Sequence, residues 1–297
     1  MNTREFGKSS ERVASLPAGA VEPALPGHRR SAPSGGTLRQ AQGDREQVGS
    51  VGASSWPYPF WIAHRGAGKL APENTLAAFK LGAGHGYRMF ECDVKLSADG
   101  ALFLLHDATL ERTTNGHGIA GDQAWGELAT LDAGSWHSAA FVNEALPTLD
   151  SIAHYCLDNG YFLNIEIKPT PGQEAATGSA VANAAAKLWP TPAVPPLLTS
   201  FAPDALEAAQ EAQPQLPRGL LLGNLWTGWL ETALSLDCIA VVCHHLLWDA
   251  SSVMQAKSAG FRCLSYTVND EASAQRLIDL GMDGLITDRV DIFNPDR

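Results

Sequence analysis

The chain has 297 residues, of which 45% are hydrophobic, and its formal net charge at pH 7 is −11. This composition is typical of a folded globular protein. The acidic balance argues against a general nucleic-acid-binding protein, which needs a basic face, and no stretch reaches the roughly 18 apolar residues of a membrane span.

Residues 1–55 differ in composition from the rest of the chain. They are rich in Gly, Pro, Ser and Arg and show no sustained apolar periodicity. Such a segment buries too little surface to offset its ordering entropy, which predicts a disordered N-terminal extension. It also lacks the apolar core of a secretory signal. The five cysteines are scattered and form no C-x-x-C pair, so we expect buried thiols and a cytoplasmic location.

Short apolar runs alternate with helical patterns from Trp56 to the C-terminus. The runs that predict buried strands are 60–64, 89–94, 161–167, 196–201, 218–223, 238–245, 262–268 and 283–287, and the clearest helical patterns are 72–86, 203–212, 251–260 and 270–282. This alternation predicts an α/β fold over residues 56–297, a (β/α)8 TIM barrel, which takes about 250 residues. A doubly wound open sheet is the alternative, but the first strand is not followed by its glycine fingerprint.

One connection breaks the alternation. Asp99 and Gly100 lie between two apolar runs, a strong signal for a tight β-hairpin that extends the second strand. A two-residue turn at this point would place Asp93 opposite His106. The following stretch, about 107–146, is too long and too apolar for a bare loop, and it predicts a small packed insertion.

Acidic side chains gather on two of the predicted strands. Alternate side chains of a strand share a face, so Glu91 and Asp93 point the same way, as do Glu166 and Lys168. Buried carboxylates are costly unless they are paired. Three of them without a thiolate suit a hard divalent cation, Mg²⁺, Ca²⁺ or Mn²⁺. A salt-bridge network with Arg65 and Lys168 is the alternative.

Basic side chains end the same strands. His64 and Arg65 end the first strand, and polar groups at the carboxyl ends of barrel strands occupy the catalytic face of this fold. With His106 and Lys168 they suit phosphoryl chemistry, in which cations stabilise phosphate oxygens and imidazoles transfer protons. Glu73 either faces the dipole of the following helix or orients Arg65.

The motifs "HRG…PENT", "E-x-D" with a following "HD", and "IEIKP" resemble the glycerophosphodiester phosphodiesterases. The match runs from about Trp56 to the C-terminus and includes "LLTSF", "YTVN" and "GLITD". The segments "WPYP", "GKLAPENTLAA" and "LPRGLLL" are similar in particular to cytosolic bacterial members associated with glycerol-phosphate uptake.

The resemblance implies metal-dependent hydrolysis of small glycerophosphodiesters, such as glycerophosphocholine and glycerophosphoethanolamine, to sn-glycerol 3-phosphate and an alcohol. The matching residues are Glu91, Asp93 and Glu166 for the cation, His64 and His106 as proton acceptor and donor, and Arg65 and Lys168 for phosphate. Tyr266, where the family often has Trp, is expected to line the substrate pocket. The preferred alcohol, the choice between a cyclic phosphate and direct water attack, and the oligomeric state stay open.

Two other functions fit the same fold. A phospholipase D-like enzyme acting on lipids needs an exposed apolar rim or an amphipathic segment, and the sequence shows no convincing one. A barrel that only binds a ligand would be expected to have lost a histidine or a carboxylate from the site, and none is missing.

Overall fold

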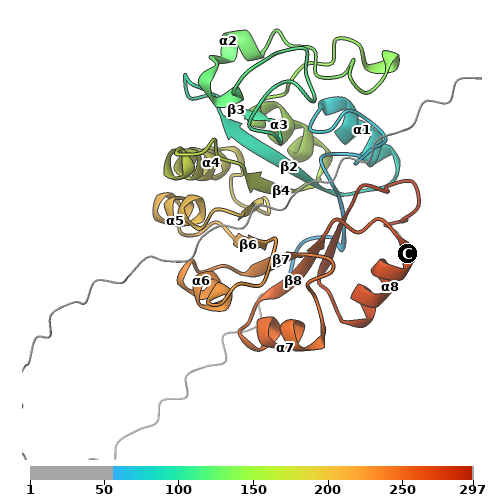
Figure 1. Cartoon of the computed structure of the whole chain (residues 1–297), viewed down its shortest axis with the longest axis vertical. Coiled ribbons are helices and arrows are strands. Elements are labelled where there is room, and N and C mark those ends of the chain that lie inside the picture. Colours follow the sequence, from blue (N-terminus) through green and yellow to red (C-terminus); the bar gives the residue numbers. More distant parts are fainter. Residues whose placement is uncertain (1–55, 296–297) are drawn as a thin grey trace, which may run out of the picture. The chain divides into compact units, whose positions relative to one another are not determined.

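The computed structural model of the protein describes residues 56–295, so the segment predicted to be disordered, residues 1–55, lies outside the described residues. Nine strands form one sheet in the order β1-β9-β8-β7-β6-β5-β4-β2-β3, and β1 also pairs with β2. The sheet is therefore closed. All pairings are parallel except that of β2 with β3, which confirms the predicted TIM barrel (Figure 1).

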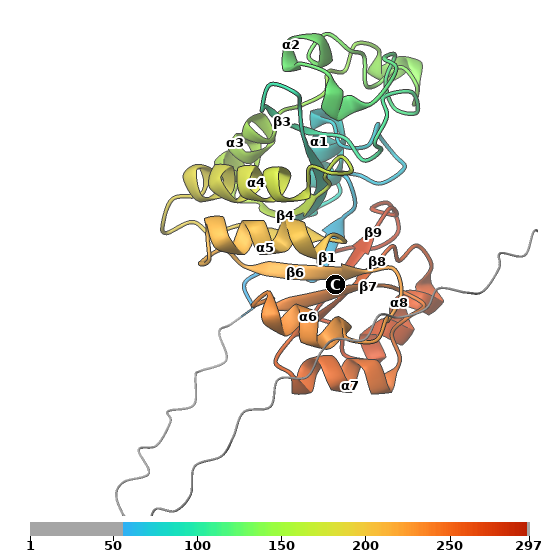
Figure 2. The same ribbon diagram turned by 60° about the vertical axis from the view of Figure 1, so that its left-hand side comes forward.

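The eight barrel strands match the eight predicted apolar runs. They are β1 (Trp61–Ala63), β2 (Met89–Leu96), β4 (Phe162–Ile167), β5 (Leu197–Ser200), β6 (Arg218–Leu222), β7 (Ala240–His244), β8 (Arg262–Tyr266) and β9 (Gly284–Thr287). The helices outside them are α1 (Leu76–Gly84), α3 (Leu149–Asn159), α4 (Glu174–Leu188), α5 (Pro203–Ala212), α6 (Trp229–Ser235), α7 (Ala250–Ser258) and α8 (Glu271–Asp279) (Figure 2). None of the helices in residues 56–295 is long and apolar enough to cross a membrane.

Side-chain caps set where several helices begin. Thr75 accepts a hydrogen bond from the backbone N–H of Ala78 at the start of α1. Asp249 and Ser252 form a reciprocal capping box at the start of α7. Such caps satisfy backbone donors that have no partner inside the helix, so they fix the point at which each loop after a strand ends.

The interior of the barrel changes character along its axis. Ile62 and Met89 belong to an apolar cluster that also includes Leu197, Leu221, Val242, Leu264 and Ile286. His64 lies two positions after Ile62, and Glu91 lies two positions after Met89. Because side chains alternate along a strand, each pair faces the same side of the sheet. The apolar cluster therefore supports the polar groups that gather at the carboxyl ends of the strands.

The β-hairpin is present, but its predicted register is wrong by one residue. Strand β3 (Leu102–Leu104) pairs with β2 so that Val94 lies opposite Leu104. The backbone N–H of Leu105 donates to the carbonyl oxygen of Asp93 at 3.0 Å, so Leu105 and not His106 faces Asp93.

The reason for the shift is a three-residue loop rather than a two-residue turn. The backbone N–H of Ser97 donates to the carbonyl of Ala101 at 2.9 Å, and the Ser97 hydroxyl accepts from the N–H of Ala101 at 2.8 Å. Gly100 supplies the left-handed conformation that this loop needs, with φ of +87°. The same hydroxyl donates to Asp99, which fixes the loop further.

The hairpin leads into the predicted small insertion. Between β3 and α3 the chain forms two 3₁₀ turns (Ala120–Asp122 and Ala139–Phe141) and the short helix α2 (Trp125–Leu128). An apolar cluster of its own holds this insertion together, with buried members that include Phe103, Leu105, Leu110, Leu128 and Leu146. Figures 1 and 2 show it beyond the end of β2, on the side of α1 and α3.

Candidate active site

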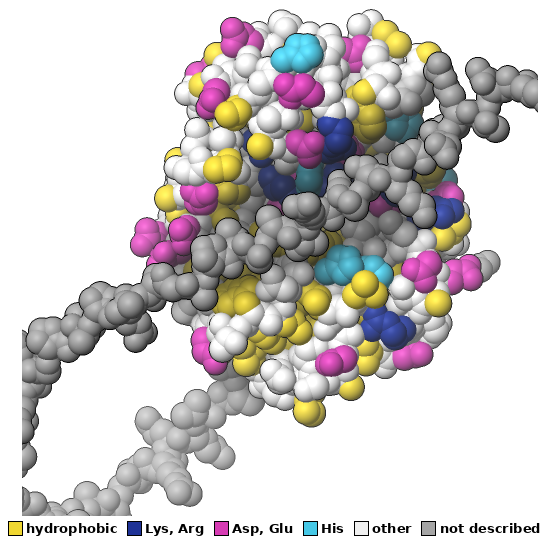
Figure 3. Space-filling model, in the orientation of Figure 1, with side chains coloured by type: hydrophobic (Ala, Val, Ile, Leu, Met, Phe, Trp, Pro, Cys, Tyr) yellow, Lys and Arg dark blue, Asp and Glu magenta, His cyan; other side chains and the backbone are white. Residues whose placement is uncertain are grey.

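A pocket of about 180 Å³ opens among the carboxyl ends of the barrel strands. Seven of the eight residues predicted for the site line it, namely His64, Arg65, Glu91, His106, Glu166, Lys168 and Tyr266. The eighth, Asp93, is fully buried and contacts two of these lining residues, Arg65 and Lys168. On the face shown in Figure 3, basic, acidic and histidine side chains gather in a central hollow.

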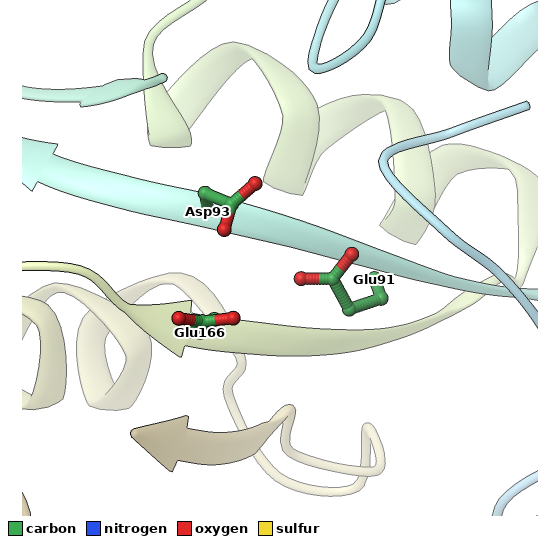
Figure 4. A group of neighbouring side chains, drawn as sticks. All are labelled: Glu91, Asp93 and Glu166. Carbon is green, nitrogen blue, oxygen red and sulfur yellow. The ribbon is translucent and has the colours of Figure 1, made fainter. Parts of the chain in front are cut away.

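Three carboxylates form the centre of the site. Glu91 and Asp93 project from β2, and Glu166 projects from β4 toward them (Figure 4). The parallel register places Asp93 beside Glu166, because these two residues are partners across the two strands. One oxygen of each side chain lies within 4.8 Å of the others. All three side chains are buried.

This crowding changes the acidity of the three groups. Burial and the charges of Asp93 and Glu166 raise the pKa of Glu91. Burial and Asp93 likewise raise the pKa of Glu166 to about 7. Burial also acts to raise the pKa of Asp93, but Arg65 and Lys168 outweigh it and hold that pKa below its usual value. The raised pKa values favour the protonated forms of Glu91 and Glu166, and an additional positive charge in the site would favour their ionised forms.

Lys168 and Arg65 form ion pairs with two of the three carboxylates. The ammonium of Lys168 donates to Glu166 at 2.7 Å and lies 3.5 Å from Asp93. The Nε atom of Arg65 lies 3.2 Å from Asp93. Glu91 differs, because it accepts the backbone N–H of Arg65 at 3.0 Å and pairs with no Lys or Arg side chain of the described residues. A salt-bridge network alone thus leaves Glu91 without a Lys or Arg partner among the described residues, and the Nε2 atom of His64 lies 3.8 Å from its carboxylate.

The loop after β1 carries Asn74, a residue that sequence reasoning did not single out. Asn74 has a left-handed backbone with φ of 58°, and Asn tolerates this region better than most residues. Its amide donates to Asp93 Oδ2 at 2.8 Å, and its amide oxygen accepts the backbone N–H of Asp93 at 3.1 Å. Asn74 therefore fixes both the backbone and the carboxylate of Asp93. Asn74 belongs to the "PENT" motif, so the family resemblance pointed to this segment, but the residue pattern itself did not indicate a role for Asn74.

Each histidine of the pocket is paired with an aspartate. The Nδ1 atom of His64 lies 2.6 Å from Asp288, and that of His106 lies 2.6 Å from Asp107. An ionised carboxylate only accepts hydrogen bonds, so Nδ1 is the donor in both pairs and Nε2 is left for the pocket. Burial lowers the pKa of His106, although the charge of Asp93 opposes this effect.

Glu73 contacts Arg65, which fits the second of the two roles predicted for it, the orientation of that guanidinium. It accepts a hydrogen bond from the Arg65 guanidinium at 2.8 Å. Two further bonds of 2.8 Å come to Glu73 from Arg112, in the insertion, which sequence reasoning missed. Nothing in the local pattern around Arg112 indicates that it reaches this loop.

Aromatic side chains form one wall of the pocket. The hydroxyl of Tyr266 donates to the backbone carbonyl of Leu222 at 3.0 Å, which fixes the ring at the end of β8. The ring of Phe201 packs edge-on against it, with centroids 5.7 Å apart. Lys168 lies over the Phe201 ring, 5.6 Å from its centroid, so this wall also positions the ammonium.

Comparison with known proteins identifies the class of enzyme. Residues 64–292 match the model of the glycerophosphoryl diester phosphodiesterase family. A glycerophosphodiester phosphodiesterase of Caldanaerobacter subterraneus is 33% identical over 234 residues, which cover 76% of this chain and 93% of that protein. A glycerophosphodiester phosphodiesterase of Bacillus subtilis is 29% identical over 249 residues, which cover 78% of this chain and 84% of the relative.

A solved structure of another phosphodiesterase has a higher sequence identity to this chain. A phosphodiesterase of Oleispira antarctica, in complex with the product sn-glycerol-3-phosphate, is 37% identical with a TM-score of 0.74 and covers 78% of this chain and 93% of that chain. The chain belongs to the glycerophosphoryl diester phosphodiesterase family and is an enzyme that hydrolyses phosphoric diesters. The narrower likeness to members associated with glycerol-phosphate uptake stays a prediction.

Proposed function

We propose that the protein hydrolyses small glycerophosphodiesters, such as glycerophosphocholine and glycerophosphoethanolamine, to sn-glycerol 3-phosphate and an alcohol. The observation that carries the proposal is one pocket that combines a carboxylate trio with two Asp-paired imidazoles. The product bound in the Oleispira relative supports sn-glycerol 3-phosphate as the product.

Glu91, Asp93 and Glu166 are proposed to hold one divalent cation. Their oxygens are hard ligands, which suits Mg²⁺, Ca²⁺ or Mn²⁺. The buried Oδ1 atom of Asp93 accepts no hydrogen bond, and Glu91 pairs with no Lys or Arg side chain among the described residues, so both have capacity for a cation. When bound, such an ion stabilises the negative charge that develops on the phosphate oxygens.

The two histidines are proposed to move the protons. His64 takes a proton through Nε2 from the attacking hydroxyl, either of water or of the substrate's own glycerol, while its Nδ1–H stays on Asp288. As the new P–O bond forms, the P–O bond to the alcohol breaks. Where the glycerol hydroxyl attacks, the product of this step is a cyclic phosphate, and water then opens the ring in a second step that releases sn-glycerol 3-phosphate. Protonated His106 gives its Nε2 proton to the departing alcohol oxygen and ends neutral, still bonded to Asp107.

Arg65 and Lys168 are proposed to bind the phosphate. Both cations line the pocket and are held by carboxylates, so their orientation is set before substrate arrives. Burial lowers the pKa of Lys168, but Asp93 and Glu166 more than compensate and raise it above its usual value. Lys168 is therefore charged at neutral pH. Tyr266 is proposed to limit the space available to the glycerol moiety.

An assay of sn-glycerol 3-phosphate release tests this function. The protein is incubated with glycerophosphocholine or glycerophosphoethanolamine and with Mg²⁺, Mn²⁺ or Ca²⁺, and EDTA is expected to abolish the release. Glu91→Ala and His106→Ala are expected to lower kcat/KM by about 10²–10⁴-fold. Glu207→Ala and His154→Ala, at exposed positions on α5 and α3, serve as matched controls. Activity retained in Glu91→Ala or His106→Ala would remove that residue from the mechanism.

A further inference from the structure

The two histidine–aspartate pairs of the pocket are anchored in different ways. Asp288 is held within the barrel, because it accepts a hydrogen bond from the Asn269 amide at 2.8 Å and its own backbone N–H donates to Asn269 at 2.9 Å. Asp107 belongs to the insertion, and its second partner is Arg112. The Nε atom of Arg112 donates to Asp107 at 2.6 Å, and its NH2 group donates at 3.1 Å.

Arg112 also reaches across to the loop after β1. Its NH1 and NH2 groups donate to the two oxygens of Glu73, each at 2.8 Å. Glu73 in turn accepts from Arg65 at 2.8 Å. One guanidinium therefore makes two-bond contacts with two carboxylates, and an uninterrupted chain of contacts runs from His106 through Asp107, Arg112 and Glu73 to Arg65.

We propose that Arg112 is a positioning residue for proton donation by His106, an inference that rests on the proposed function. A planar guanidinium holds both oxygens of Asp107 in a fixed direction, which a single point charge cannot do. Asp107 then keeps the Nδ1–H of His106, so that Nε2 is held toward the alcohol oxygen. Arg112 itself is not among the residues that line the pocket.

The insertion has other attachments to the same loop and to the first turn of α1, so removal of Arg112 leaves it in place. Glu144 accepts the backbone N–H of Ala77 at 3.0 Å, and the ring of His137 lies 3.1 Å from the carbonyl oxygen of Lys69. The insertion also has its own apolar cluster. Arg112 is half-exposed, with 45% of its side chain accessible, so its replacement opens no buried cavity. The effect of its loss should therefore fall on the orientation of His106 rather than on folding.

A proton donor matters only when the leaving group needs a proton. Glycerophosphoethanolamine releases an alkoxide that has to be protonated, whereas the p-nitrophenyl ester of sn-glycerol 3-phosphate releases a phenolate that does not. The Arg112→Gln variant should therefore lose about 10-fold or more of kcat on the first substrate and less than about 3-fold on the second. A merely structural loss would lower both rates equally.

The experiment compares Arg112→Gln, Arg112→Lys and His106→Gln with the unchanged protein on both substrates at saturating Mg²⁺. Arg112→Lys keeps the positive charge but not the planar guanidinium with its several donors, and its kcat on glycerophosphoethanolamine is expected to lie between those of Arg112→Gln and the unchanged protein. Arg262→Gln is the matched control, since Arg262 pairs with Asp283 at 3.0 Å at the opposite end of the barrel and is also partly exposed. It is expected to leave both rates unchanged.

The outcomes separate the inference from the function on which it rests. If His106→Gln loses both rates equally, His106 is not the donor, and the proposed mechanism and the inference fall together. If His106→Gln shows the leaving-group difference but Arg112→Gln does not, only the inference is overturned. Full kcat in Arg112→Lys or Arg112→Gln on glycerophosphoethanolamine would overturn it as well.

Discussion

The Nδ1 atom of His64 lies 2.6 Å from Oδ1 of Asp288, although 224 positions separate the two residues in the chain. His64 directly follows β1 and Asp288 directly follows β9, and the pairing of these strands closes the barrel. The backbone N–H of His64 donates to the carbonyl of Thr287 at 3.0 Å, which continues that pairing up to the site. The imidazole is thus oriented by the residue that directly follows β9, the final strand along the chain.

Asp288→Asn should lower kcat by about 10²-fold or more with little change in KM, because an amide no longer selects the Nδ1–H form of His64. Asp283→Asn is a matched control, since both side chains are 13% exposed and flank the two ends of β9. Steady-state kinetics with glycerophosphoethanolamine measures the difference. An equal loss in the two variants would assign Asp288 a role in stability alone.

The affinity for Mg²⁺ should increase as pH rises. The pKa of Glu166 is raised to about 7 by burial and by Asp93, and that of Glu91 is raised as well. Protons on these carboxyl groups have to leave before a cation binds, so the cation competes with fewer protons as pH rises through the pKa of Glu166. Calorimetric titration between about pH 6 and pH 8, in buffers of different ionisation enthalpy, would count the protons released. A dissociation constant independent of pH in this range would contradict the expectation.

Gly68→Ala should destabilise the protein by about 1–3 kcal/mol and lower activity. Gly68 has φ of +58°, and a Cβ atom built on it would overlap backbone atoms of Asp288. The added methyl group would push apart the two loops that bring His64 and Asp288 together. Gly84→Ala, at the end of α1, is the control, because a Cβ there meets nothing within 4 Å. Thermal unfolding of both variants measures the difference, and equal midpoints would argue against this packing.

Strand periodicity was sufficient to predict the barrel, because all eight parallel strands are buried on both faces and appear as separate apolar runs. It was less informative for the helices. Residues 149–159, 174–188 and 229–235 are helical but were not among the clearest patterns, and α4 illustrates why. Seven of its fifteen residues are alanine, so hydrophobic and exposed positions differ little in the sequence.

The candidate site was predictable where its residues lie on strands. Glu91 and Asp93 share one face of β2 by alternation, and the predicted barrel places polar groups at the strand ends on its inner side, where the neighbouring strand β4 adds Glu166. Residues that act from loops were not predictable. Arg112 reaches Glu73 across 39 positions, and no local rule gives that distance. The hairpin register failed for a related reason, since the hydroxyl of Ser97 selects a longer loop than Asp99-Gly100 suggests.

Closure of the barrel by β1 and β9 also bears on the order in which the protein acquires its parts during synthesis. The strands with the three carboxylates, β2 and β4, leave the ribosome well before Asp288, which follows the final strand. A nascent chain that has reached β8 already contains these acids but has no partner for His64. The contact between His64 and Asp288 therefore forms only after β1 and β9 have paired, and under the proposed mechanism activity depends on that contact.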